Sequence, residues 1–231
     1  MSIFIYLYFS MENNSRGKIL MIVANQGTSS VTGWPIGFWW AELTHPYHEF
    51  TSNGYRVEIA SPDGGDLFAD MYSDPEHESR YSAHDFISLG FKHSPLTRDL
   101  IKNTKKLSEI DTLSYDAIFF VGGQSPMVTF VDKVELQSTL AEYYETGRPT
   151  GLVCHGTCLL LKTKLSDGKL LVDGKKWTGF ADSEEQFAEQ AVGGKIQPFW
   201  IETEARKIDN TLFEVAPAFT PFAIADGNLI T

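Results

Sequence analysis

The stretch AIFFVGGQSPMVTF (Ala117–Phe130) is followed, after a polar segment, by PTGLVCHGTCLLL (Pro149–Leu161), and these two pieces decide the fold class. Each piece opens with a short apolar run that ends abruptly in a turn, and each run is too short and too rich in β-branched or aromatic residues for a helix. The runs therefore predict two buried parallel strands. Ligands of open α/β sheets bind outside the carboxyl ends of the strands. We expect the turns that begin at Gly122 and at Cys154 to lie side by side at that edge.

Cys154 lies where the second strand must stop and where a helix-like run begins. This is the position of a nucleophile elbow, which presents a side chain above the sheet. A thiol at a helix start is expected to favour the thiolate, because the helix dipole and free amides stabilise negative charge. The neighbouring His155 offers a base or an orienting cation, and its backbone N–H can face the same anion as that of Gly123. The alternative is that Cys154 is a small buried hydrophobe.

The composition is that of one globular domain that is not built for nucleic acid. The chain has 231 residues, of which 42% are hydrophobic and 21% are charged, enough for one sizeable core. Its formal net charge of −11 argues against a phosphate-backbone partner. The two cysteines lie on one expected helix and predict neither a disulfide nor a zinc site, so no metal is expected. A reducing compartment, the cytoplasm, fits this cysteine usage.

The first residues, MSIFIYLYFSM, are apolar but do not predict a membrane anchor. The run lacks a basic start and a small-residue cleavage site, and it is too short to span a bilayer. We interpret residues 1–17 as an N-terminal extension, with Met11 as an alternative start. Residues 18–231 are then a single domain, with no membrane contact expected.

Strand and helix patterns alternate through the first half of this domain. KILMIVA (residues 18–24) and YRVEIA (residues 55–60) are typical of strands, and a helix is expected between them. That helix, within FWWAELTHPYHEF, carries Glu42 among aromatic residues. Burial would raise the pKa of Glu42, and a protonated Glu42 can donate to a thiolate. The alternative is a solvated glutamate on a helix face.

Two features of the last third of the chain carry predictions. LLVDGKKW (residues 170–177) is typical of a hairpin with Asp173 and Gly174 at its turn. The run ADSEEQFAEQAV predicts a helix whose first turns carry Glu184 and Glu185. These acids either complement the helix dipole or serve a site.

Several ordered motifs resemble one known superfamily: FFVGGQSPM, GLVCHG, FWWAELTHPY, KKWTGFADSEE and IADGNLIT. Together they are similar to the ThiJ/PfpI superfamily, the class I glutamine amidotransferase-like fold, and to its branch of heat-shock chaperone and glyoxalase III proteins. The resemblance covers nearly the whole chain from Lys18. It implies an α/β fold, a flavodoxin-like three-layer sandwich with a mostly parallel central sheet and a cysteine nucleophile elbow.

The resemblance also implies roles for residues of a catalytic site. Cys154 is the expected nucleophile, His155 its neighbouring imidazole, and Glu42 the protonated partner and general base. Glu185 is expected to orient His155, with Glu184 as the alternative acid, because only one of two successive helical residues can point at the imidazole. Gly123 and His155 would supply the oxyanion hole through their backbone N–H groups.

Three functions follow from these residues. The favoured prediction is a glutathione-independent glyoxalase, which converts methylglyoxal to lactate through a Cys154 hemithioacetal and proton transfer by Glu42, without cofactor or metal. An amidase or peptidase-type hydrolase is the second, so the substrate is a small aldehyde or amide. A redox-sensing holdase chaperone is the third. Superfamily members are commonly homodimers, so a homodimer is possible here.

Two departures from the family pattern bear on this choice. Many glyoxalase III members have His-Gly after the glycine pair, whereas this chain has Gln124, Ser125 and Pro126, which weakens a direct transfer of activity. Family members usually continue beyond the equivalent of LIT, whereas nothing follows Thr231. Either the chain is truncated at its C-terminus or the fold is closed in another way.

Overall fold

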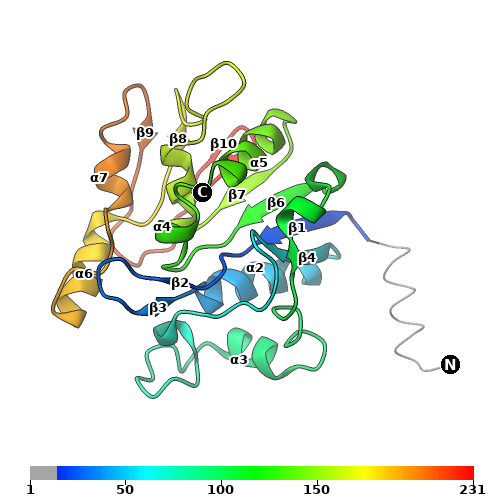
Figure 1. Ribbon diagram of the computed structural model, residues 1–231, viewed down its shortest axis with the longest axis vertical. Coiled ribbons are helices and arrows are strands. Elements are labelled where there is room, and N and C mark those ends of the chain that lie inside the picture. The colour runs from blue at the N-terminus through cyan, green and yellow to red at the C-terminus, as the bar shows by residue number, and fades with distance from the viewer. Residues whose placement is uncertain (1–14) are drawn as a thin grey trace.

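A seven-stranded sheet forms the centre of the molecule in residues 15–231, which are the residues that the computed structural model describes (Figure 1). The predicted extension, residues 1–17, falls almost entirely outside them. In spatial order the strands are β10 (Ala225–Asp226), β11 (Leu229–Ile230), β7 (Thr150–Leu152), β6 (Ala117–Phe120), β1 (Lys18–Ile22), β4 (Arg56–Ser61) and β5 (Lys105–Lys106). Each pair is parallel except β10 with β11. The predicted α/β fold with a mostly parallel sheet is confirmed.

The central strand β1 is buried on both faces, which explains its continuous apolar sequence. Side chains of successive strand residues point to opposite faces. Leu20 and Ile22 belong to one core cluster, and Ile19 and Met21 belong to the other. The two clusters are the two layers of side chains that hold helices against the sheet.

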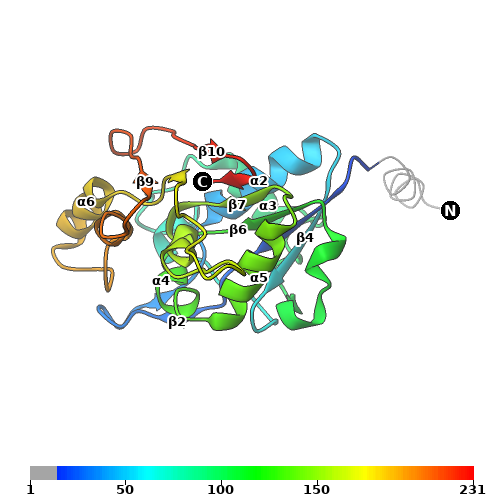
Figure 2. The ribbon, with the colours of Figure 1, turned by 90° about the horizontal axis from the view of Figure 1, so that it is seen from above.

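Helices cover both faces of the sheet, and Figure 2 shows α2 and α5 on opposite sides of the strands. The longer helices are α2 (Trp40–Ser52), α3 (Phe86–His93), α5 (Val134–Glu145) and α6 (Asp182–Val192). The other helical segments are α4 (Pro126–Thr129), α7 (Ile201–Ala205) and the 3₁₀ segments η1 (Met71–Ser73), η2 (Leu107–Glu109), η3 (Thr112–Ser114) and η4 (Cys154–Leu161). Among residues 15–231 no helix is long and apolar enough to cross a membrane.

The predicted hairpin over residues 170–177 is wrong. Asp173 and Gly174 do form a turn, but Leu171 and Val172 enter the core instead of forming a ladder. The following strand β8 (Lys176–Trp177) pairs in parallel with β9 (Leu212–Phe213). A second small ladder joins β2 (Gly27–Thr28) to β3 (Pro35–Ile36). The Asp-Gly pair correctly predicted a turn in the chain. The apolar residues before it pack into the core instead of pairing with the residues after it.

Candidate active site

Cys154 lies on a sharp turn at the carboxyl end of β7. Val153 is extended, whereas Cys154 has a φ angle of 53°, in the left-handed region that non-glycine residues rarely adopt. The turn is held by the Gly156 N–H, which donates to the Val153 carbonyl at 2.9 Å, and by the Thr157 hydroxyl, which donates to the Cys154 carbonyl at 2.5 Å. The predicted elbow is therefore present, and its backbone is strained.

The glycine turn that follows β6 packs directly against this elbow. A Cβ atom at Gly122 would collide with the Glu42 carboxyl and would lie 2.8 Å from the Cys154 Cβ. A Cβ at Gly123, whose φ is 100°, would lie 2.5 Å from the Trp39 amide nitrogen. Only glycine allows the thiol, the carboxyl group and the start of α2 to approach this closely.

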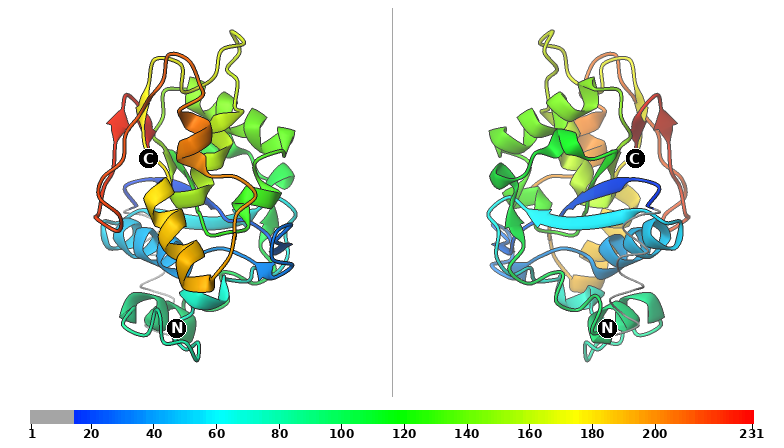
Figure 3. Two further views of the ribbon diagram at one scale, coloured as in Figure 1. Left: turned by 90° about the vertical axis from the view of Figure 1, so that its left-hand side faces the viewer. Right: turned by 90° about the vertical axis from the view of Figure 1, so that its right-hand side faces the viewer.

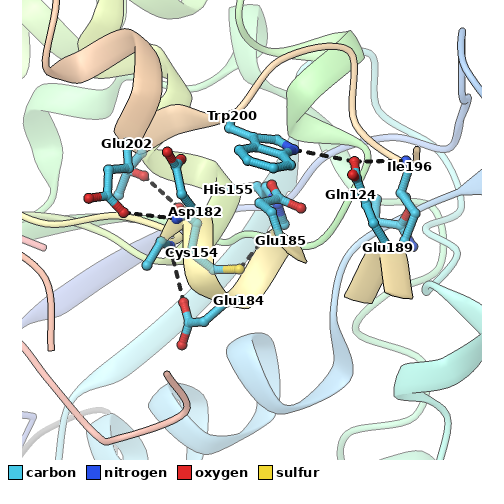
Figure 4. Close-up of polar contacts among 12 residues, drawn as sticks. Gln124, Cys154, His155, Asp182, Glu184, Glu185, Glu189, Ile196, Trp200 and Glu202 are labelled. Atoms are coloured by element: carbon cyan, nitrogen blue, oxygen red, sulfur yellow. Dashed lines mark hydrogen bonds and ion pairs between the residues drawn. The ribbon is translucent and has the colours of Figure 1, made fainter. Parts of the chain in front are cut away.

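His155 links the thiol to a buried carboxylate. Its Nδ1 lies 3.3 Å from Cys154 Sγ, and its Nε2 lies 3.0 Å from Glu185 Oε1. His155 is 5% exposed and Glu185 is 1% exposed. The imidazole also packs against the Phe180 ring, with centroids 4.4 Å apart. Thiol, imidazole and carboxylate thus form a continuous chain of polar contacts (Figure 4).

Glu184 has different partners from its neighbour. Its Oε2 accepts a hydrogen bond from the Ala181 N–H at 3.1 Å, and its Oε1 accepts one from the Phe219 N–H at 2.9 Å. Figure 4 shows Glu184 extending away from the imidazole while Glu185 lies beside it. The structure therefore brings Glu185, and not Glu184, to His155.

Glu42 lies in the first turn of α2 with a buried carboxyl group beside the thiol. No hydrogen-bond partner among residues 15–231 reaches its Oε2. Burial raises the pKa of Glu42 to about 7, although the neighbouring Cys154 thiol, His155 and the Gly123 amide each lower it. A carboxyl group with this pKa can take up and release a proton near neutral pH.

The expectation that the helix start lowers the pKa of Cys154 is wrong. Burial raises the pKa of the thiol, and the Glu42 carboxylate raises it further. The amides of His155 and Gly123 lower it, but by less. The segment that follows is a 3₁₀ helix, and the desolvation of the sulfur outweighs its free N–H groups. Cys154 and Glu42 therefore titrate as a coupled pair.

The pKa of the imidazole is also raised, but by neighbouring charges and against the effect of burial. Burial lowers the pKa of His155, but the Glu185 carboxylate, helped by Glu42 and Asp70, raises it by more. The net increase favours an imidazolium whose Nδ1–H can donate to the sulfur. This arrangement stabilises a thiolate once the proton has left Cys154.

Asp70 is a buried acid of the site that sequence reasoning missed. Its Oδ1 accepts a hydrogen bond from the Gly37 N–H at 2.9 Å, and its Oδ2 accepts one from the Gln124 N–H at 2.7 Å. One carboxyl group thus joins the segment before α2 to the glycine turn after β6. Burial raises the pKa of Asp70 to about 7, while these amides and His155 lower it. No spacing signal could have found it, because both partners are backbone groups distant in sequence.

A pocket of about 220 Å³ opens over the thiol. Its lining includes Glu42, Cys154 and Thr157, which form its inner wall, and also includes Val215 and Phe222 from a later segment of the chain. Within residues 15–231 no group of three or more His, Cys, Asp or Glu side chains is placed to hold a metal ion. The pocket therefore offers a small molecule a thiol, a proton-carrying carboxyl group and several apolar side chains.

Known proteins are similar to this chain over most of its length. The sequence profile of the DJ-1/PfpI family matches residues 37–231. Glyoxalase 3 of Candida albicans is 26% identical over 217 residues, which cover 92% of this chain and 89% of that protein. The crystal structure of glyoxalase III from Candida albicans superposes with a TM-score of 0.72 at 23% identity, covering 92% of this chain and 89% of that one. The Rapid Encystment Protein 24 kDa of Francisella tularensis gives a TM-score of 0.79 at 24% identity, covering 92% and 90%. The chain belongs to the DJ-1/PfpI family.

Proposed function

We propose that this protein is a glutathione-independent glyoxalase that converts methylglyoxal to lactate. The observation that carries the proposal is the buried Glu42 carboxyl group, whose pKa is raised to about 7 beside the Cys154 thiol. Conversion of a 2-oxoaldehyde to a hydroxy acid moves a proton from one carbon to the next, which requires a base next to the carbon bound to sulfur. Hydrolysis of an amide needs no such second base.

In the first step Cys154 Sγ attacks the aldehyde carbon of methylglyoxal. Glu42 takes the thiol proton and returns it to the aldehyde oxygen, which leaves a neutral hemithioacetal and a Glu42 carboxylate. The carboxylate then removes the hydrogen from the former aldehyde carbon, giving an enediolate with its negative charge on the former ketone oxygen. Return of that proton to the neighbouring carbon, together with transfer of the hydroxyl proton from the former aldehyde oxygen to the former ketone oxygen, gives the thioester of lactate on Cys154.

Water completes the reaction by hydrolysing this thioester. The regenerated Glu42 carboxylate can accept a proton from the attacking water and return it to the departing sulfur. The His155 imidazolium, oriented by Glu185 at 3.0 Å, stabilises that sulfur as it leaves. The N–H groups of Gly123 and His155 are the candidates to stabilise the oxyanion. The products are lactate and the free thiol, so the cycle consumes only methylglyoxal and water.

Several relatives support this reaction. The Candida albicans protein is named glyoxalase 3, and a Saccharomyces cerevisiae relative, 24% identical over 200 residues, is named a glutathione-independent glyoxalase. Gln124 stands where many glyoxalase III members have histidine, yet its contact with the site described above is a backbone one, to Asp70. That contact does not depend on the side chain at position 124.

The test is lactate formation from methylglyoxal with no thiol added. Glu42→Gln should lower kcat by about 10²-fold or more while Cys154 can still be alkylated, because the base is lost and the nucleophile remains. Glu49→Gln, an exposed substitution on the same helix, is the matched control. Lactate formation by Glu42→Gln at the rate of the parent would show that Glu42 is structural and would overturn the mechanism.

The thiol, His155 and Glu185 also suit a cysteine hydrolase. Their contacts of 3.3 and 3.0 Å have the order of a catalytic triad, so an amidase or peptidase is the second candidate. Amide turnover that survives Glu42→Gln would favour it over the glyoxalase. The chaperone role, the homodimer and the cytoplasmic location stay predictions, which holdase assays, sedimentation and cell fractionation can test.

A further inference from the structure

The pocket has an outer wall built from the segment that follows β9, residues 215–222. Val215, Pro217 and Phe222 of this segment line the same pocket as Cys154, and Thr220 is the one polar side chain that the segment adds to the lining. The other lining side chains of the segment are apolar, and Phe222 is 45% exposed. This outer wall therefore presents apolar surface to whatever occupies the space above Cys154.

The outer wall is held in place by Glu184. This side chain accepts one hydrogen bond from Ala181 at the start of α6 and one from the Phe219 N–H in the wall. Phe219 has a φ of 59°, and its ring packs edge-on against Phe187 of α6 with centroids 5.0 Å apart. Figure 3 shows this orange-to-red part of the chain beside α6. The contacts give the wall a defined position over the pocket.

The space between thiol and wall exceeds what methylglyoxal fills. The pocket of about 220 Å³ has room for several water molecules. Methylglyoxal has five non-hydrogen atoms, and its only apolar group is one methyl. With its aldehyde carbon on Cys154, the group on the ketone carbon is the part of the substrate that can extend toward Val215 and Phe222.

We propose that the outer wall selects 2-oxoaldehydes whose ketone carbon carries an apolar group larger than methyl, and that Phe222 is its main specificity-determining residue. This inference rests on the proposed glyoxalase function and names its substrate class. The chemistry is unchanged: sulfur still adds to the aldehyde carbon, and Glu42 still moves the proton. The larger apolar group moves out of water and into contact with the apolar side chains of the outer wall.

The first experiment compares kcat/KM for phenylglyoxal with kcat/KM for methylglyoxal in the parent and in variants. Phe222→Ala should lower the ratio of the two values by about tenfold, the scale expected when an apolar contact is removed from a specificity pocket. Phe86→Ala is the matched control, because Phe86 is 73% exposed on α3 and does not line the pocket. The ratio of the two values does not depend on the amount of active protein. Comparing this ratio between variant and parent also cancels the difference in intrinsic reactivity between the two aldehydes. An unchanged ratio in Phe222→Ala would overturn the inference while leaving the glyoxalase intact.

A second readout needs no turnover. Cys154 is alkylated with iodoacetamide and with N-phenyliodoacetamide, and each rate is divided by that of glutathione with the same reagent. The parent should prefer the phenyl reagent, and Phe222→Ala should lose that preference. Should neither aldehyde be turned over while this preference holds, the proposed function fails and the selection by the wall stands. Equal relative rates for both reagents in the parent would overturn the selection itself.

Discussion

The two walls of the pocket are built in opposite ways. The inner wall comes from the turns after β6 and β7 and from the first turn of α2, where buried groups and close glycine contacts leave little freedom. The outer wall is a largely exposed loop that two contacts tie to α6: the hydrogen bond to Glu184 and the packing of Phe219 on Phe187. The inner wall holds every group that touches the reacting atoms in the proposed mechanism. The difference separates chemistry, which needs a rigid frame, from selectivity, which a loop can change at low cost to the fold.

The largest expected effect distinguishes the inner wall from the core directly behind it. Cys154→Ser should lower turnover by about 10³-fold or more, because the hydroxyl is a far weaker nucleophile than the thiol in this site. Cys158 is fully buried and donates to the Pro126 carbonyl at 3.4 Å, a contact that Cys158→Ser can keep. We expect Cys158→Ser to remain active and to unfold at a lower temperature. Comparable activity losses in the two variants would contradict the assignment of the nucleophile.

Two successive glutamates on α6 contact different walls of the pocket, so their substitutions should affect different kinetic constants. Glu185→Gln removes the carboxylate that orients His155 and should lower kcat by about 10²-fold or more. Glu184→Gln should change KM more than kcat, with a total loss below about tenfold. The Ala181 and Phe219 N–H groups donate to different oxygens of Glu184, and glutamine replaces one of these oxygens with an NH2 group that cannot accept. Steady-state kinetics with methylglyoxal checks both. A larger kcat loss in Glu184→Gln than in Glu185→Gln would reverse the assignment of the walls.

The pH profile sharpens the description of the inner wall. The titratable groups that face Glu42 are Cys154, His155 and Asp70. The proposed first step needs the Glu42 carboxylate to accept the thiol proton, so kcat/KM should rise as pH passes about 7, the raised pKa of Glu42. Asp70→Asn removes a negative charge that raises this pKa, so the rise should move to lower pH. A lower rate with an unmoved profile would assign Asp70 a purely structural role.

The smallest expected effect is on stability. The pKa of Glu42 is raised from 4.5 to about 7, so the folded protein binds this proton more tightly than the unfolded chain does. Its contribution to the free energy of unfolding is therefore greatest below pH 4.5 and is lost as pH rises to about 7. Relative to the parent, Glu42→Gln should gain on the order of 1–3 kcal/mol between these pH values. Denaturant unfolding at pH 5 and pH 8 measures it, and a difference that does not change with pH would contradict the buried carboxyl group.

Sequence reasoning predicted the inner wall better than the outer one, for a physical reason. Short apolar runs that end at Gly122 and Cys154 are local signals, and parallel strands bring their ends to one edge of the sheet. The choice of Glu185 over Glu184 also followed from local helix geometry. Asp70 and Glu184 both accept hydrogen bonds from backbone N–H groups that are distant in sequence. Every residue type except proline has such a group, so no pattern of residue types predicts these contacts. The pKa of the thiol depends on desolvation in the assembled fold, which no local rule supplies.

The left-handed backbone of Cys154 has a consequence for anyone who evolves this protein in the laboratory. A non-glycine residue at a φ of 53° costs about 1–2 kcal/mol relative to glycine. Selection for heat resistance alone would therefore enrich Cys154→Gly, which relaxes the turn and removes the sulfur. Libraries screened for thermal stability should therefore keep cysteine at position 154, because the most stable variant at this position is an inactive one.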